Sequence, residues 1–271
     1  MSITLYTAPN CLRCKIVKDF LGAHGQEFTA YDFKEEKEKF DAFFRANRAS
    51  IYRNPEGLEF PILDDGTVIK QGSGEIIAYL LSNRALEACV KRSDLLHGWI
   101  SGLNLSACPP DEDTHFLELL QTLSKGGLQV FLETDGRRSD LLEKVLTAGS
   151  IERLALNILG PAHLYPELAG GTISIDDLKK SIAMTRTHKD HVIRLYIVAF
   201  TGKDGKAARI DPAQAAEAAK MVFEACGERQ LPFWIEAAPP AKGMEKLEDQ
   251  RLLPYRSKVR SILVKTEIRK A

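Results

Sequence analysis

The sequence shows no surplus of charge of either sign, because its 37 lysine and arginine residues match its 37 aspartate and glutamate residues. Binding to a nucleic acid needs a positive surplus, so we expect no nucleic acid among the partners. Long apolar runs are also absent. No stretch approaches the ~18 consecutive apolar residues of a membrane span, and we expect no membrane partner. The chain starts at Met1-Ser2-Ile3 without a basic and then apolar leader, which predicts a cytoplasmic protein.

Cysteine is scarce, with 5 residues in a chain of 271. That number is too small for a disulfide scaffold, so the placement of each thiol matters more than the count. Two cysteines form a C-x-x-C motif, Cys11 and Cys14, and the other three, Cys89, Cys108 and Cys226, stand alone. The composition, with 44% hydrophobic and 27% charged residues, is that of a globular protein. The chain length predicts about two domains.

Residues 1–84 alternate between strand-like and helix-like patterns in the order β-α-β-α-β-β-α. Apolar residues recur at helical spacing after the C-x-x-C motif, and Asp64-Asp65-Gly66 between two β runs predicts a hairpin. The expected elements are strands at 3–6, 27–33, 60–63 and 67–71, helices at 11–24 and 35–48, a loop at 50–59, and a helix capped by Ser73.

The remainder of the chain repeats strand-then-helix units, which predict a parallel sheet. About five or six such units make a partial β/α barrel, short of a full one. The expected strands lie at 95–101, 128–133, 153–159, 192–200 and 231–237, and the expected helices near 113–125, 139–149, 174–187 and 211–227. The segment 259–268 fits either a helix or a last strand. The predicted fold class is α/β, with a domain at 1–84, a linker at 85–94 and a partial barrel at 95–271.

The C-x-x-C motif falls where a strand passes into a helix. Cys11 would lie at the helix N-terminus, where free N–H groups and the helix dipole stabilise a thiolate, and Arg13 and Lys15 add positive charge nearby. Cys14 follows one turn later, in position to attack a mixed disulfide formed on Cys11. We therefore expect Cys11 to be the exposed nucleophile and the inward-facing Cys14 to be the resolving thiol.

Together with two further motifs, this pair resembles the glutaredoxins, a family with the thioredoxin fold. Phe60-Pro61 stands where that family has a cis-proline, and Gly72-Ser73-Gly74-Glu75 opens the last helix where the family holds the γ-glutamyl carboxylate of glutathione. The resemblance, which covers residues 2–84, implies thiol–disulfide exchange with a disulfide-bearing protein or glutathione, without a cofactor or a metal. Glutathione would be a co-substrate. The site residues that the resemblance implies are the catalytic Cys11 and Cys14 and the substrate-binding Pro61, Gly72, Ser73 and Glu75.

The cysteine pair has other interpretations. A zinc site would need two more ligands, which the H-x-x-H motif of His188 and His191 in the other domain offers. A phosphatase or arsenate-reductase loop would need an arginine where Val17 stands. In another interpretation, the two cysteines are left over from the ancestral fold and perform no chemistry.

Parts of the second domain resemble radical S-adenosylmethionine activating enzymes. The runs 128–136 and 153–161 are similar to two strands of that family, which end in Thr-Asn-Gly and near Lys-Ala-Pro. Gly98-Trp99-Ile100-Ser101-Gly102 resembles the strand that ends in the family's Ser-Gly-Gly-Glu-Pro. The family's cluster motif, C-x3-C-x2-C, is absent, because Thr7 stands four positions before Cys11. The resemblance, from about 95 to 240, therefore implies a degenerate barrel without an iron–sulfur cluster.

Polar residues follow the expected barrel strands. Ligand sites of parallel α/β folds lie at the C-terminal ends of strands, where Glu133, Asp135 and Asn157 stand. We expect these three residues to form the barrel mouth, whereas the alternative interpretation makes them ordinary loop and cap residues. Cys108 lies in the loop after the first barrel strand, either as a third redox thiol or as an isolated cysteine.

These observations favour a thiol–disulfide oxidoreductase in which the barrel provides substrate or partner specificity. The alternative is a non-catalytic binding or docking protein in which neither domain turns over. A glutathione transferase does not fit, because its second domain would be all helical and the second domain predicted here contains strands.

Overall fold

The computed structural model describes residues 3–54, 57–91, 98–171, 173–202, 205–240 and 243–269. The chain divides into two compact units, one of residues 1–132 with 148–152 and one of residues 133–147 with 153–271. Residues 92–94 of the expected linker and 95–97 of the expected strand lie outside the described residues. The domain boundaries expected at 84 and 94 stay a prediction. None of the helices within the described ranges combines the length and the hydropathy needed to cross a membrane.

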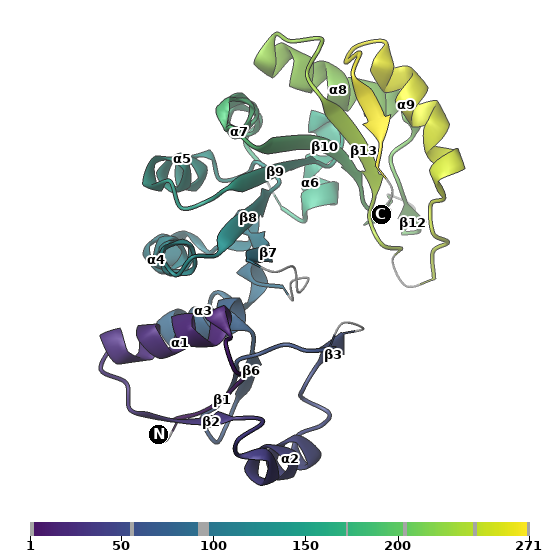
Figure 1. Cartoon of the computed structure of the whole chain (residues 1–271). Coiled ribbons are helices and arrows are strands. Elements are labelled where there is room, and N and C mark those ends of the chain that lie inside the picture. The colour runs from purple at the N-terminus through teal and green to yellow at the C-terminus, as the bar shows by residue number, and fades with distance from the viewer. Residues whose placement is uncertain are drawn as a thin grey trace. The chain divides into compact units, whose positions relative to one another are not determined.

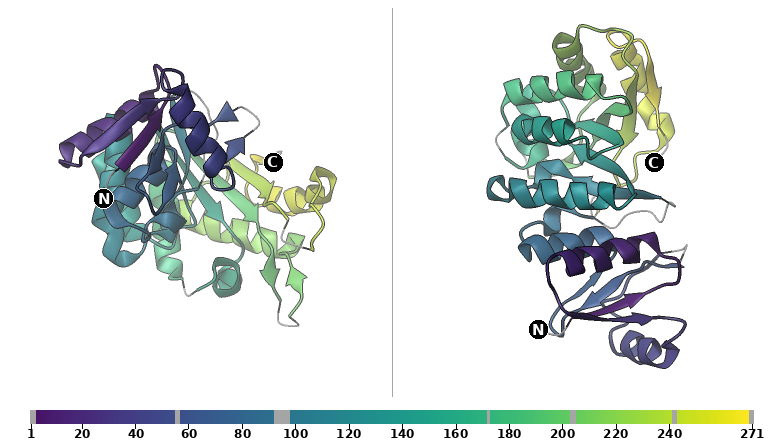
Figure 2. Two further views of the ribbon diagram at one scale, coloured as in Figure 1. Left: turned by 90° about the horizontal axis from the view of Figure 1, so that it is seen from below. Right: turned by 60° about the vertical axis from the view of Figure 1, so that its left-hand side comes forward.

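A four-stranded sheet forms the centre of the N-terminal part of the first unit. Its strands are β1 (Ile3–Thr7), β2 (Phe28–Asp32), β5 (Ile62–Asp64) and β6 (Ile69–Gln71), in the order β2-β1-β5-β6. β1 and β2 are parallel, whereas the β1–β5 and β5–β6 pairs are antiparallel. Helices α1 (Leu12–Ala23) and α3 (Ser73–Ser82) cover one face and α2 (Lys37–Ala46) covers the other (Figures 1 and 2). The predicted thioredoxin-like fold is confirmed.

Apolar side chains fill both sides of this sheet. On the α2 side, the ring of Tyr6 stacks on that of Phe43, with centroids 4.0 Å apart, and Phe40 packs beside them. On the other side, Val17 of α1 and Ile77 of α3 are fully buried. The inward positions follow from the helical spacing of the apolar residues, which brings one face of each helix onto the sheet.

Two local predictions for this region are wrong. The expected loop at 50–59 contains a short hairpin of β3 (Arg53–Asn54) and β4 (Gly57–Leu58). Ser73 is the first residue of α3 rather than its cap, because Gly72 occupies the N-cap position with a φ of 84°. A positive φ of this kind favours glycine. The serine hydroxyl is left buried without a partner among the described residues.

The first unit continues beyond α3 into the larger sheet. It contains the short 3₁₀ helices η1 (Glu87–Cys89), η2 (Leu105–Ala107) and η3 (Pro110–Glu112), strand β7 (Trp99–Asn104), helix α4 (Asp113–Lys125) and most of β8 (Gln129–Thr134). Helix α4 coincides with the helix predicted at 113–125, and it contacts α1 and α3. The contact with α1 is close, since a Cβ at Gly126 would collide with Cγ1 of Ile16.

A parallel sheet forms the centre of the second unit. Its strands β9 (Arg153–Ile158), β10 (His191–Ile197), β13 (Phe233–Ala237) and β14 (Thr266–Ile268) pair in parallel. With β8 and β7 the full strand order is β14-β13-β10-β9-β8-β7. The accompanying helices are α5 (Ser139–Ala148), α6 (Tyr165–Ala169), α7 (Ile175–Thr187), α8 (Pro212–Cys226) and α9 (Leu253–Arg260) (Figure 1). The predicted partial parallel β/α barrel is confirmed.

The smaller elements of this unit correct two expectations. They are the 3₁₀ helices η4 (Ala162–Leu164) and η5 (Asp249–Leu252) and a hairpin of β11 (Phe200–Thr201) and β12 (Ala207–Ala208). The strand expected at 192–200 stops at Ile197, because Phe200 belongs to this hairpin. The segment 259–268, expected to be a helix or a strand, contains both the end of α9 and β14.

The two faces of β9, β10 and β13 differ in polarity, because side chains alternate along a strand. One face packs with α7 and α8 in a single apolar cluster. Its members include Leu156, Ile158, Ile193, Leu195, Phe233 and Ile235, with Leu178, Ile182, Ala218 and Val222 from the helices. The alternate positions carry Asn157, Arg194, Tyr196 and Glu236, and the register pairs Arg194 with Asn157 and Tyr196 with Glu236. Polar residues of this sheet therefore gather on the face opposite to α7 and α8.

Candidate functional site

The cysteine pair lies at the start of α1, after the turn that follows β1. Cys11 is the N-cap of α1, and its Sγ accepts a hydrogen bond from the backbone N–H of Cys14 at 3.1 Å. The two residues form a disulfide, with Cα atoms 5.2 Å apart. Cys11 is partly exposed, whereas Cys14 is 3% exposed and lies on the buried face of the helix. Of the two sulfurs, that of Cys11 is the one a substrate can reach, while the catalytic roles stay a prediction.

Three segments meet at the sheet edge that holds the pair. The pairing of Tyr6 with Ile62, and of Ile62 with Gln71, puts the end of β1, the start of β5 and the end of β6 side by side. Pro61 follows a cis peptide bond, and its carbonyl accepts a hydrogen bond from the N–H of Gly72 at 2.8 Å. The structure therefore places Pro61 and Gly72 at the same edge as the C-x-x-C motif.

Ser73 and Glu75 lie in the first turn of α3. Ser73 is buried, so its hydroxyl is not available at the surface, and its predicted role in substrate binding stays a prediction. The carboxylate of Glu75 is 3.5 Å from the N–H of Gln71 and lines a cavity of about 310 Å³ together with Lys70 and Tyr79. The two residues thus face different surroundings, although they are close in sequence.

An ion pair with little exposure to water, which no motif reveals, joins the C-x-x-C segment to the cis-proline segment. Nη1 of Arg13 is 3.3 Å from Oε1 of Glu59, and the two side chains are 11% and 8% exposed. Nη2 of Arg13 donates a hydrogen bond to the carbonyl of Trp99 at 2.7 Å. The available signal was an acidic residue between Leu58 and Phe60, because a charge in an apolar run needs a partner.

In the second unit, Glu133 and Asn157 meet around Arg194. Nε of Arg194 donates to Oδ1 of Asn157 at 2.7 Å, and Nδ2 of Asn157 donates to Oε2 of Glu133 at 3.1 Å. Nη2 of Arg194 is 3.2 Å from Oε1 of Glu133, and Nη1 is 2.7 Å from Oε2 of Glu236. The Arg194 cluster, made of these four residues, combines one cation with two carboxylates, and each guanidinium nitrogen has a partner.

Arg194 and Glu236 are the members of this cluster that the predicted barrel mouth lacked. Glu236 follows the pattern of a polar residue near the end of a strand. Arg194 stands alone as a charge within the run Val192-Ile193-Arg194-Leu195-Tyr196-Ile197. A buried arginine must find acceptors on neighbouring strands, because an unpaired buried charge is strongly unfavourable.

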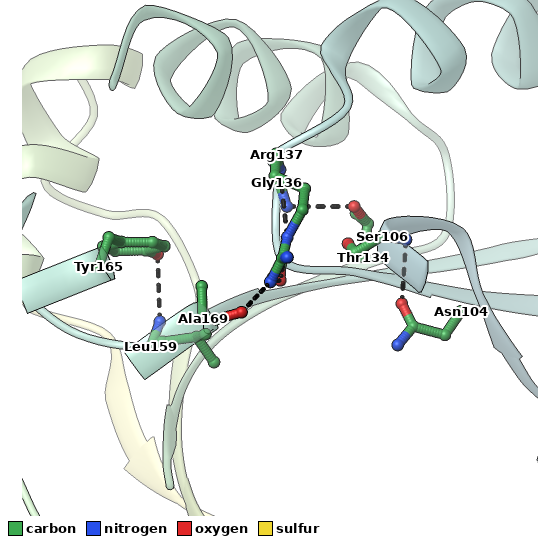
Figure 3. A network of polar contacts seen from close by, with 9 residues as sticks. Asn104, Ser106, Thr134, Gly136, Arg137, Leu159, Tyr165 and Ala169 are labelled. Carbon is green, nitrogen blue, oxygen red and sulfur yellow. Dashed lines mark hydrogen bonds and ion pairs between the residues drawn. The ribbon is translucent and has the colours of Figure 1, made fainter. Parts of the chain in front are cut away.

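Asp135 makes a different contact. Nε of Arg137 donates to its Oδ2 at 2.9 Å, and Nη2 of Arg137 donates to the carbonyl of Ala169 at 2.8 Å (Figure 3). In the same loop, the N–H of Gly136 donates to Oγ1 of Thr134 at 3.1 Å. These contacts hold the loop after β8 in place. The structure thus joins two of the three predicted mouth residues in one cluster, and gives Asp135 a role in the loop.

Tyr165 anchors the adjoining end of β9. The side chain is fully buried, and its hydroxyl accepts a hydrogen bond from the N–H of Leu159 at 3.1 Å (Figure 3). Burial raises the pKa of this phenol. The group therefore stays protonated at neutral pH and contributes no charge to the region.

The remaining cysteines provide no metal-binding set. Cys89 and Cys108 are buried, and a hydrogen bond with Cys108 together with burial raises the pKa of Cys89. Nδ1 of His191, from the H-x-x-H motif, is occupied by the carbonyl of His188 at 2.7 Å. In the described part of the chain, no group of three or more His, Cys, Asp or Glu side chains is arranged to hold a metal. The residues there do not fit the three-thiolate site of a radical enzyme's cluster.

No known family matches the sequence, and no curated protein matches it. Solved structures that resemble the chain include the glutaredoxin-like protein NrdH-redoxin from Escherichia coli, at 25% identity over 27% of this chain and 84% of that chain, with a TM-score of 0.22. A domain of pyruvate-formate lyase-activating enzyme from Bacteroides vulgatus is 13% identical over 63% of this chain and 100% of that chain, with a TM-score of 0.39. TYW1 with a lysine-pyruvate adduct is 16% identical over 47% and 50%, with a TM-score of 0.29.

Proposed function

We propose that this protein is a thiol–disulfide oxidoreductase of the glutaredoxin type, with Cys11 as nucleophile and Cys14 as resolving thiol. The observation that carries the proposal is the Cys11–Cys14 disulfide at the N-terminus of α1, with one residue partly exposed and the other buried. Free N–H groups and the positive end of a helix dipole favour a thiolate at such a position. A cytoplasmic, reducing setting would supply the pair in its dithiol form.

The exchange has two steps. In the reduced protein, the thiolate of Cys11 attacks one sulfur of a substrate disulfide, which forms a mixed disulfide and releases the first substrate thiolate. The thiolate of Cys14 then attacks Sγ of Cys11, which closes the Cys11–Cys14 disulfide and releases the second substrate thiolate. Two electrons pass to the substrate, and the protons lost by the two cysteines are taken up by the released thiolates. An external dithiol returns the pair to its reduced form.

The partial barrel enters this proposal as the domain that provides substrate or partner specificity. The member of the Arg194 cluster that a partner can contact is Glu133, whose side chain is 32% exposed and lies with Arg194 on the sheet face opposite to α7 and α8. The partner would be a disulfide-bearing protein that the barrel recognises and whose disulfide is the substrate of Cys11.

The test uses the variants Cys11→Ser and Cys14→Ser, both in a Cys226→Ser background that removes the half-buried free thiol. Each reduced variant is mixed with a small protein disulfide and analysed by intact mass spectrometry. Cys14→Ser should accumulate a mixed disulfide, because no second thiol expels the partner. Cys11→Ser should stay unmodified. An adduct that forms as readily on Cys14 would reverse the roles, and no adduct in either variant would favour a non-catalytic binding protein.

A further inference from the structure

The ion pair between Arg13 and Glu59 stands between the C-x-x-C motif and the segment that leads to cis-Pro61. Glu59 is buried and the side chain of Arg13 is only 11% exposed, so the attraction between their charges is screened less than it would be at the surface. The positive charge that the motif brings to this sheet edge is therefore compensated from within the chain.

A second acceptor holds Arg13 in place, since Nη2 donates to the carbonyl of Trp99. Turning the guanidinium toward a ligand would break this hydrogen bond. It would also separate the two charges of an ion pair that has little contact with water, which is unfavourable. Arg13 is consequently committed to these contacts rather than to an anionic group of a substrate.

Glu59 also stands at the N-terminus of α3. A Cβ on Gly72, the N-cap of this helix, would lie 2.5 Å from Oε1 and 2.8 Å from Cδ of Glu59. The N-terminal end of a helix carries partial positive charge and favours nearby anions. Here a carboxylate of the chain itself takes that position, so a substrate carboxylate approaching it would meet a like charge.

Lys15, the other cation near the motif, adds no uncompensated positive charge there. Its side chain is 71% exposed and pairs with Asp19 on the next turn of α1, at 2.6 Å. Exposed pairs of this kind are weakened by water and by salt. The two ion pairs, Arg13–Glu59 and Lys15–Asp19, together add no net charge beside Cys11.

We propose that Glu59 determines which disulfides the cysteine pair accepts, by removing the attraction of this edge for anionic substrates. The proposal rests on the thiol–disulfide exchange proposed above and specifies its substrate class. The accepted disulfides have neutral or basic surroundings, such as a protein disulfide flanked by lysine or uncharged residues. Oxidised glutathione, which carries net negative charge, is then a poor substrate. Glu59 takes no part in the exchange of bonds and acts only through its charge.

The test compares oxidised glutathione with cystamine, a disulfide that carries two ammonium groups. Stopped-flow measurements follow oxidation of the pre-reduced cysteine pair by each compound. The ratio of the two rate constants, glutathione to cystamine, is divided by the same ratio for free dithiothreitol, which removes the intrinsic reactivity of the compounds. We expect a normalised ratio at or below one for the unmodified protein.

Two variants should move this ratio in opposite directions. Glu59→Gln keeps the shape of the side chain and removes its charge, so the ratio should rise about fivefold. Arg13→Gln removes the positive charge of the ion pair and keeps the negative charge of Glu59, so the ratio should fall by a similar factor. Asp41→Asn is the matched control, because its exposed carboxylate lies on α2, across the sheet from α1 and α3 (Figure 1). A Glu59→Gln ratio equal to that of the control would overturn the proposal.

The salt dependence of the unmodified protein provides a second, independent measurement if Glu59→Gln fails to fold. If Glu59 neutralises the charge of Arg13, the rate of reaction with oxidised glutathione should hardly change with ionic strength. A rate that falls steeply as salt is added would reveal an uncompensated cation and overturn the proposal. The absence of reaction with either disulfide would instead contradict the thiol–disulfide function itself.

Discussion

Arg194 and Glu236 form an ion pair across β10 and β13, with Nη1 of the guanidinium 2.7 Å from Oε2 of the carboxylate. The arginine is 8% exposed and the glutamate 15% exposed, so water solvates neither group well. Removing one partner of a buried pair leaves the other charge uncompensated, and the loss exceeds that of a surface pair. Substitutions in the Arg194 cluster should therefore lower the free energy of unfolding.

Glu236→Gln should lower the free energy of unfolding by about 1–3 kcal/mol, because it weakens a hydrogen bond to a buried charged group. Glu133→Gln is the matched control. Its side chain is 32% exposed, so we expect a loss below about 1 kcal/mol. Urea denaturation followed by circular dichroism measures both. Equal losses for the two variants would contradict the assignment of Glu236 as the main partner of Arg194.

Asp65 should make the stability of the chain depend on pH. The hydroxyl of Tyr79 donates to Oδ2 of Asp65 at 2.5 Å, and the N–H groups of Thr67 and Val68 each donate to Oδ1 at 2.8 Å. Burial by itself would raise the pKa of this carboxyl, but the hydrogen bonds outweigh it and lower the pKa below the ordinary value. The resulting stabilisation is complete above the unfolded pKa of about 3.9 and is lost as the pH falls through the lower folded pKa.

Asp65→Asn should therefore reduce the free energy of unfolding at neutral pH, and its difference from the unmodified protein should shrink below about pH 4. Tyr79→Phe removes one of the hydrogen bonds and should cost about 1 kcal/mol at neutral pH. Urea titrations at a series of pH values give both numbers. A difference for Asp65→Asn that stays constant into the acid range would refute this account.

Gly72→Ala should be more costly than an alanine at another glycine of positive φ. Gly25 has a φ of 63° and open space around a Cβ, so Gly25→Ala should cost about 1 kcal/mol from backbone strain alone. At Gly72 the φ is 84° and the new Cβ would also meet the carboxylate of Glu59, so we expect a loss above about 2 kcal/mol. Thermal and chemical unfolding of the two variants provide the comparison. Similar losses would show that the Glu59 carboxylate moves aside freely.

Thiol titration should separate the disulfide from the free cysteines. Without reductant, the denatured protein should show the thiols of Cys89, Cys108 and Cys226, and all 5 cysteines should titrate after reduction. In the native protein, Cys226 should react first, because it is only half-buried. Cys89 should react last, because it is buried and its pKa is raised. Rapid labelling of Cys89 under native conditions would contradict its burial.

Periodic patterns in the sequence were sufficient to predict long elements, whose structure follows from their own residues. The helix predicted near 113–125 coincides with α4, in which Phe116, Leu119, Leu120 and Leu123 recur at helical spacing and are all buried. The short hairpin within 50–59 was missed because strands of two residues leave almost no periodic pattern. Ser73 was misplaced because the conformation of Gly72 depends on its hydrogen bond to Pro61, which is a tertiary contact.

The sequence by itself determined the order of the longer helices and strands and the position of Cys11 and Cys14 at a strand-to-helix junction, because both follow from periodicity and residue type over short distances. Only the tertiary structure decided the partners of Arg13 and Arg194. Arg13 pairs with Glu59 across 46 positions, and Arg194 with Glu236 across 42. Such pairs depend on strand order and register, and a shift of one residue would turn every side chain of a strand to the opposite face.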